Sequence, residues 1–103
     1  MYPRRTVTEQ AYRDEAVNKF GPDVRAWKFV CPVCGHIASG QDYIDAGAPA
    51  GAIAFSCIGR WTGGKGTLFN NKTQPCNYAG GGLFALNPVE VIGVGCYFEL
   101  ADG

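Results

Sequence analysis

The sequence predicts a small α+β domain with one N-terminal helix, short strands and a C-terminal β-hairpin, held together by a cross-link among its cysteines. Three observations predict this class: the chain has 103 residues, five cysteines and fifteen glycines. A domain this small buries only about 60–70% of the surface of its unfolded chain, so a cross-link adds useful stability. The glycines cluster after Gly47 and favour turns and short strands over regular helix.

We predict a single domain over residues 1–103, because no charge run or Ser/Pro-rich tract marks a linker. Nine basic and nine acidic residues cancel, which argues against a nucleic-acid coat protein or an acidic DNA mimic. No stretch approaches the roughly 20 apolar residues of a membrane span. The N-terminal MYPRRTVTEQ has no apolar run of signal-peptide length, and the cysteine count is odd. We therefore expect an intracellular protein with a metal site in place of a disulfide set.

Residues 6–20 are predicted to form the one convincing helix. Thr6 with Glu9 three residues later has the capping-box pattern, and Gly21 begins a stop signal. An apolar stripe at helical spacing is expected to pack on the rest of the domain. It consists of Tyr12, Ala16, Val17 and Phe20.

Three short elements are predicted next. Residues 24–31 alternate in polarity, with the aromatic side chains and Cys31 on one side, as in a strand that leads into a metal-binding turn. Residues 39–46 are expected to form a short capped turn of helix, and residues 49–55 a second one that begins with proline.

The second half of the chain is expected to be poor in regular structure. Residues 59–82 are predicted to be loop-like, and the glycines at 80–82 favour a tight packing corner. Residues 89–92 and 96–100 are β-rich runs separated by Gly-Val-Gly, which predicts a closing hairpin. The metal-binding core is thus expected to span residues 24–100.

Cys31-Pro-Val-Cys34-Gly35 is the sharpest local signal. Two thiolates separated by two residues can both reach one tetrahedral ion when the residues between them fold into a tight turn, and Gly35 gives the backbone freedom for it. The pattern predicts a zinc-ribbon-like knuckle with Zn²⁺ as the cofactor, and the sequence does not distinguish zinc from iron. A thioredoxin-like redox pair is disfavoured, because no βαβ pattern surrounds Cys31 and Cys34.

The two remaining ligands are best assigned to Cys57 and Cys76, since both lie among chain-reversing residues. Cys96 lies on an alternating apolar run and is predicted to be a core residue. His36 follows Cys34 so closely that the knuckle turn should carry its ring away from the ion. Cys96 and His36 stay open as replacements for a proposed ligand. The predicted set is Cys31, Cys34, Cys57 and Cys76.

Residues 59–65 (GRWTGGK) match the first seven positions of a phosphate-binding P-loop. The next residue is Gly66, where a magnesium-binding Ser or Thr belongs, so nucleotide hydrolysis is not predicted. Glycines expose three side chains of this segment to a possible partner. The candidate partner-binding residues are Arg60, Trp61 and Lys65.

Catalysis is not expected. The chain has a single histidine and no paired carboxylates in one motif, and a metal ion with four sulfur ligands has no open position for acid–base or metal-hydroxide chemistry. An enzyme with a cysteine nucleophile is the alternative to a non-catalytic protein. It would use Cys57 or Cys34 as the nucleophile and His36 as the base.

Three blocks together resemble a family of small proteins encoded by bacteriophages and prophages. They are CPVCGH at residues 31–36, CIGR at 57–60 and PCNYAGGGLF at 75–84. The resemblance covers residues 27–88 and implies a bacterial cytoplasmic setting and a phage accessory role. It implies no catalytic residue.

These observations favour a non-enzymatic accessory protein that binds a bacterial host protein, with a host defence complex such as a CRISPR effector as one possible target. The alternative is a zinc-ribbon-like nucleic-acid-binding protein of phage transcription or replication. That protein would use Lys28, Arg60, Trp61 and Lys65.

Overall fold

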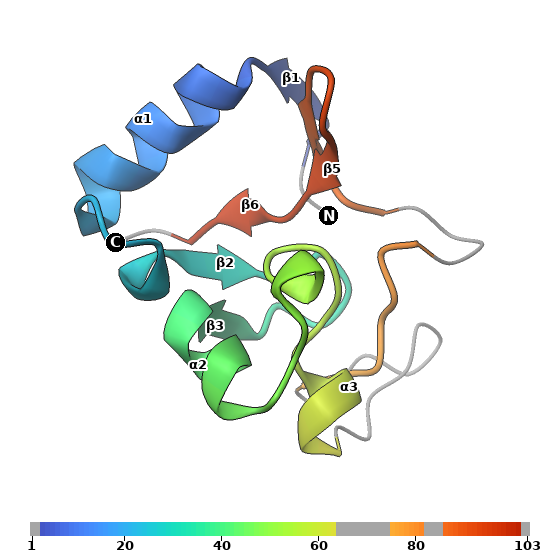
Figure 1. The fold of residues 1–103 in the computed structure, drawn as a ribbon. Coiled ribbons are helices and arrows are strands. Elements are labelled where there is room, and N and C mark those ends of the chain that lie inside the picture. The colour runs from blue at the N-terminus through green and yellow to red at the C-terminus, as the bar shows by residue number, and fades with distance from the viewer. Residues whose placement is uncertain (1–2, 64–74, 82–85, 102–103) are drawn as a thin grey trace.

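The computed structural model describes residues 3–63, 75–81 and 86–101. It has an α+β fold built from two small sheets and short helices (Figure 1). The predicted fold class, the N-terminal helix and the C-terminal hairpin are confirmed.

The first sheet joins the two ends of the chain in the order β1-β4-β5. Strand β1 (Arg5–Val7) pairs in parallel with β4 (Val89–Val91), and β4 pairs antiparallel with β5 (Gly95–Tyr97). The β4–β5 pair is the predicted hairpin. Gly93 in its turn has a φ of 78°, a left-handed conformation that glycine adopts without strain.

The second sheet has the order β3-β2-β6, with both pairings antiparallel. Its central strand β2 (Lys28–Val30) lies between β3 (Ile37–Ser39) and β6 (Glu99–Leu100). The sequence suggested one strand over residues 96–100, and this is wrong, because the run divides between the two sheets. Phe98 is buried at the crossing, where its N–H donates to the Ala54 carbonyl at 2.7 Å.

Helix α1 (Glu9–Phe20) begins three residues later than expected. Thr8 caps it, and its Oγ1 accepts from the Ala11 N–H at 3.1 Å. Thr6, the predicted cap, lies in β1 opposite Glu90. The pairing of β1 with a strand more than eighty residues away therefore decides where the helix starts, and the local capping pattern does not.

Fewer residues of the apolar stripe of α1 contact the core than the sequence predicts. Tyr12 and Ala16 are buried and Phe20 packs on the core, as predicted, but Val17 is 41% exposed. The Tyr12 hydroxyl donates to the Phe98 carbonyl at 2.7 Å and joins the helix to the chain between the two sheets.

The other helices are short. They are the 3-10 turns η1 (Val24–Ala26) and η2 (Ala50–Ala52) and the helices α2 (Gly40–Asp45) and α3 (Gly59–Thr62). The predicted capped turn is α2, in which Ser39 and Asp42 form a capping box. Helix α3 corrects the expectation that residues 59–82 are loop-like throughout, and η1 occupies the first part of the strand predicted at 24–31. None of the helices in the described ranges is long and apolar enough to cross a membrane.

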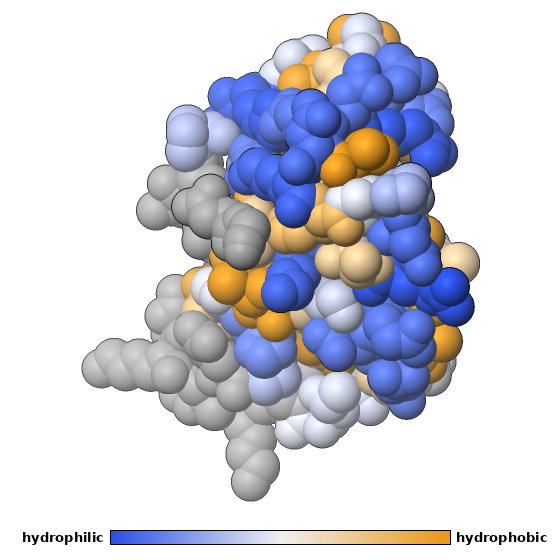
Figure 2. Space-filling view, turned by 90° about the vertical axis from the view of Figure 1, so that its left-hand side faces the viewer, coloured by the Kyte–Doolittle hydropathy of each residue, from blue (hydrophilic) through white to orange (hydrophobic). Residues whose placement is uncertain are grey.

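One core cluster contains aromatic side chains together with four of the cysteines. Its buried members come from α1, both sheets and the loops, and include Tyr12, Trp27, Phe29, Cys31, Cys34, Cys57, Cys76, Tyr78, Val89, Phe98 and Leu100. A smaller cluster of Ala38, Tyr43 and Ile58 lies under α2 and α3, with Trp61 packed against it. Hydrophilic residues cover most of the face shown in Figure 2, with apolar residues in a band across its middle.

Arg5 forms a bridge between two carboxylates that belong to different elements. Its guanidinium donates to both oxygens of Glu15 on α1 at 2.7 and 2.9 Å, and to both oxygens of Glu99 on β6 at 2.7 and 2.9 Å. Burial raises the pKa of Glu99, but the hydrogen bonds from Arg5 and from the Leu100 N–H outweigh it, so the pKa lies below its usual value. The charged form of Glu99 therefore stabilises the fold.

We predict that Glu99→Gln lowers the free energy of unfolding at neutral pH by about 1–3 kcal/mol, because it weakens charged hydrogen bonds to Arg5. The folded pKa of Glu99 lies below its unfolded value of about 4.5, so this stability is complete above that pH and is lost as the pH falls through the folded pKa. Denaturant unfolding at several pH values should thus show the difference between wild type and variant shrinking in acid.

The matched control is Glu90→Gln on β4, where the carboxylate accepts one hydrogen bond at 3.3 Å from an exposed threonine. This variant should stay within about 0.5 kcal/mol of wild type. A wild-type advantage over Glu99→Gln that is constant down to pH 3 would contradict the role assigned to the Glu99 charge.

Candidate metal centre

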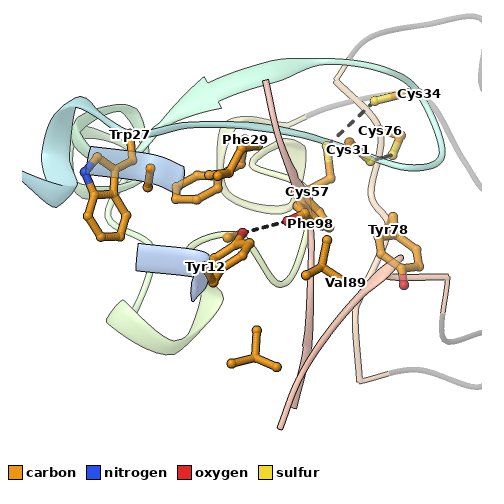
Figure 3. Close-up of a cluster of buried hydrophobic side chains, with 14 residues drawn as sticks. Tyr12, Trp27, Phe29, Cys31, Cys34, Cys57, Cys76, Tyr78, Val89 and Phe98 are labelled. Carbon is orange, nitrogen blue, oxygen red and sulfur yellow. Dashed lines mark hydrogen bonds between the residues drawn. The ribbon is translucent and has the colours of Figure 1, made fainter. Parts of the chain in front are cut away.

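Four cysteine sulfurs lie together at one end of the core. The sulfurs of Cys31, Cys34, Cys57 and Cys76 are all within 4.8 Å of one another, and no other group of three or more possible ligands in the described ranges is this close. Each residue is at most 7% exposed. Figure 3 shows them at one end of the aromatic cluster, with Trp27 at the other. The four residues predicted as ligands are those that the fold brings together.

The first pair lies in the turn between β2 and β3. The Cys31 N–H donates to the His36 carbonyl, and the Gly35 N–H donates to the Cys31 carbonyl, both at 3.0 Å. Gly35 has a φ of 78°, which permits the tight reversal. Because β2 and β3 are paired up to this point, the strands fix where the Cys31 and Cys34 sulfurs lie.

The second pair comes from two loops that run beside each other. The Cys57 N–H donates to the Tyr78 carbonyl at 2.9 Å, and the Gly80 N–H donates to the Ser56 hydroxyl at 3.1 Å. These bonds hold the segment that contains Cys76 against the segment that contains Cys57.

Two glycines make this close approach possible. A Cβ on Gly59 would lie 1.9 Å from the Cys76 carbonyl oxygen, and a Cβ on Gly80 would lie 2.0 Å from the Phe55 carbonyl oxygen. Both distances are far below van der Waals contact, so any side chain would separate the loops. The packing corner predicted around Gly80 is therefore part of the cysteine site.

Two pairs of sulfurs are in direct contact. The Cys31 and Cys76 sulfurs are 3.8 Å apart, and the Cys34 and Cys57 sulfurs are 3.9 Å apart. With metal–sulfur bonds of about 2.3 Å, the edge of a tetrahedron of sulfurs is about 3.8 Å long. The spacing of the sulfurs therefore fits one tetrahedral metal ion.

The protonation of the cluster also depends on a cation. The neighbouring Cys31 thiol lowers the pKa of Cys57, and the same interaction together with burial raises the pKa of Cys31. Burial raises the pKa of Cys76. Without a cation, a second buried thiolate beside the first is unfavourable, and a divalent ion removes that repulsion.

Backbone N–H groups in the ligand loops counter the effect of burial. They favour the thiolate form at three of the sulfurs, as expected of a site that binds a cation through charged sulfur. The donors are the N–H groups of Cys34 and Val33 for Cys31, of Gly59 and Cys76 for Cys57, and of Tyr78 for Cys76. The donor set, its spacing and these N–H groups all fit a metal ion.

The two competing ligands lie elsewhere. Cys96 is in β5 and outside the cluster, and it is only half-buried, which corrects its assignment as a core residue. The His36 imidazole is also outside the group of sulfurs, while the His36 carbonyl closes the knuckle turn.

Two of the three predicted partner residues lie beside the site. Arg60 and Trp61 are in α3, which begins two residues after Cys57. Arg60 is exposed, and its guanidinium carbon is 5.7 Å from the centroid of the half-buried Trp61 ring. Lys65 lies outside the described residues.

Sequence reasoning missed the side chains that hold the ligand loops from behind. Ser56 is buried, its hydroxyl accepts from the Gly80 N–H, and its carbonyl accepts from the Tyr43 hydroxyl at 2.7 Å. Ser56 and Tyr43 could not be found from the sequence, because their hydrogen-bond partners come from distant parts of the chain. The only sequence feature that points to Ser56 is its position directly before Cys57.

A family model described as VVA0879-like matches residues 8–98. The chain belongs to the VVA0879-like family. The matched span contains α1 and all four cysteines of the cluster, so membership covers the whole candidate site. It also contains the region that resembles phage-encoded proteins, and the phage origin stays a prediction. No curated protein and no solved structure matches the chain.

We predict that serine at position 31, 34, 57 or 76 weakens metal binding by more than about 100-fold, because loss of even a hydrogen-bond partner of a ligand typically costs about 10–100-fold. Elemental analysis and competition with a chromophoric chelator measure this. The matched control is Cys96→Ser, which should retain the metal of the wild type. Metal loss from Cys96→Ser, or full retention by Cys76→Ser, would overturn the ligand set.

Proposed function

We propose that this VVA0879-like chain is a non-enzymatic binding protein whose four-cysteine cluster holds a structural zinc ion. The observation that carries the proposal is that four buried sulfurs lie within 4.8 Å of one another. Four thiolates complete a tetrahedral shell and leave no position for water or substrate. When bound, the ion supplies a cross-link between the β2–β3 turn and the two loops.

Zinc is favoured over iron by the chemistry of the ligands. Sites of four sulfurs suit both Zn²⁺ and iron, and on the same divalent site the affinity order places Zn²⁺ above Fe²⁺. An iron-loaded protein would be coloured once its iron is oxidised to Fe³⁺ in air, whereas a zinc-loaded one stays colourless, so the absorption spectrum of the air-exposed protein separates the two.

Support for a non-enzymatic role comes from the surroundings of the thiols. Cys57 and Cys34, the candidate nucleophiles, are 1% and 7% exposed and lie inside the cluster. A nucleophilic thiol has to reach a substrate, and metal-bound sulfurs with this burial cannot.

The binding surface that we propose is α3. Its position is tied to the ion because Cys57 lies just before it, and Trp61 anchors it on the cluster formed by Ala38, Tyr43 and Ile58. Arg60 then presents a guanidinium beside an aromatic ring, a pair of residue types that is enriched at protein interfaces. A bacterial host protein as the partner, and a defence complex as its class, remain predictions from the sequence.

Removal of the metal tests the structural role. A structural zinc ion contributes on the order of 10 kcal/mol to folding, comparable to the whole stability of about 5–15 kcal/mol of a typical domain. We expect a strong chelator to abolish the dispersed amide resonances of the protein and added Zn²⁺ to restore them. Cys96→Ser should behave in the same way. A spectrum unchanged after complete loss of metal would contradict the structural role.

Arg60→Ala tests the proposed surface. The side chain is exposed, so its loss should leave the unfolding free energy within about 0.5 kcal/mol of wild type. Capture of a specific host protein from bacterial lysate by the wild type should be weakened at least about tenfold in the variant, since a hot-spot arginine is worth more than about 1.4 kcal/mol.

The matched control is Arg25→Ala, because Arg25 is also exposed, lies on η1 and pairs with Asp23. This variant should capture the partner normally. Equal capture by all three proteins would rule out α3 as the surface. Salt-sensitive retention of nucleic acid in place of a protein would support the nucleic-acid-binding alternative.

A further inference from the structure

A second candidate site lies away from the cysteines. A cavity of about 270 Å³ opens between α1, η2 and the β4–β5 hairpin, and none of the four clustered cysteines lines it. Its walls include four aromatic residues. They are Tyr12, Trp27, Phe29 and Tyr97.

The polar atoms of two wall residues point to the backbone. The Tyr12 hydroxyl donates to the Phe98 carbonyl at 2.7 Å, and the Trp27 indole N–H donates to the Gly21 carbonyl at 2.8 Å. Because both donors are satisfied elsewhere, these residues offer the cavity mainly their apolar rings. A ligand would meet aromatic surface here and few hydrogen-bonding groups.

Two of the residues that line the cavity are charged, Glu9 and Arg13, and their charges neutralise each other. Arg13 and Glu9 form an ion pair at 3.2 Å on α1. Val24 and Val94, which are 47% and 52% exposed, also line the cavity. A charged ligand would find no unpaired opposite charge among these residues, so the lining favours an uncharged one.

Ala54 is a strained residue in the wall. It has a φ of 61°, and it is the only non-glycine residue in the described ranges with a positive φ. It is buried, and its carbonyl accepts the hydrogen bond from Phe98 that holds it in place. Strained backbone persists only where its surroundings fix it, and such residues concentrate at binding sites.

We propose that this cavity binds a small, flat, uncharged aromatic molecule of about two fused rings. An apolar cavity of about 150 Å³ is sufficient for benzene, and the present one has a volume of about 270 Å³. Flat ligands can stack on or contact the edges of the wall rings, which adds to the burial of apolar surface. The site goes beyond the proposed function, since neither the four clustered cysteines nor any residue of α3 lines it.

The test uses 2-naphthol as the probe and the full-length chain as purified. The protein has two tryptophans, so its ¹H–¹⁵N spectrum contains two indole N–H signals, which a Trp61→Phe variant assigns. We expect the Trp27 signal to shift saturably with a Kd of about 1 mM or tighter, because a bound ring lies against that indole. The Trp61 signal should not move.

Variants at the mouth decide whether the shift reports this cavity. Ala50→Phe and Val94→Phe place a ring into the space and should each weaken binding by at least about tenfold. Ala26→Phe is the matched control, because Ala26 is exposed on η1 and does not line the cavity. It should bind 2-naphthol as the wild type does.

A second probe separates a free ligand from a partner protein. N-acetyl-phenylalaninamide mimics an aromatic side chain of a partner, and we expect it to bind more weakly than 2-naphthol because it has one ring and a polar backbone. Equal or tighter binding of this compound would overturn the proposal in favour of a protein anchor. Absence of a saturable shift, equal shifts of both indole signals, or unchanged binding by both filled variants would also overturn it.

Discussion

The constraint on which this fold depends is the burial of four cysteine sulfurs side by side, and in their thiolate form this burial is unfavourable unless a cation lies among them. The cysteines come from the β2–β3 turn and from two later loops, and they belong to the same core cluster as Tyr78 and Phe98. Whatever fixes the sulfurs therefore also fixes the aromatic core. In a domain of this size, that coupling replaces the larger apolar core that a longer chain would bury.

Two kinds of interaction hold distant segments of the chain together. At the cysteine cluster, Gly59 and Gly80 allow backbone segments to meet at distances that no side chain would permit. Away from the cysteines, Arg5 joins β1, α1 and β6 through two carboxylates. If the cluster holds the proposed ion, acid weakens both the cysteine cluster and the ion pairs of Arg5, while a chelator acts on the cysteine cluster alone.

The proposed surface and the proposed cavity lie on different parts of this framework. Helix α3 begins two residues after Cys57, so the cysteine cluster helps to set its position. The cavity lies under α1, and Ala54 in its wall is three residues before Cys57. The loop from η2 to α3 thus connects all three sites, and its geometry is held by hydrogen bonds to Phe98, Tyr43 and Tyr78.

The sequence by itself determined the α+β class, the helix, the hairpin and the four cysteines, because these follow from local spacing: a C-x-x-C turn, chain-reversing residues around Cys57 and Cys76, and short β-rich runs around glycine. Only the tertiary structure decided where α1 starts, how the last run divides between two sheets, and which side chains support the ligand loops. Those features depend on contacts between residues far apart in the chain, such as Thr6 with Glu90 and Ser56 with Gly80. A local sequence pattern does not predict which distant residues will make contact.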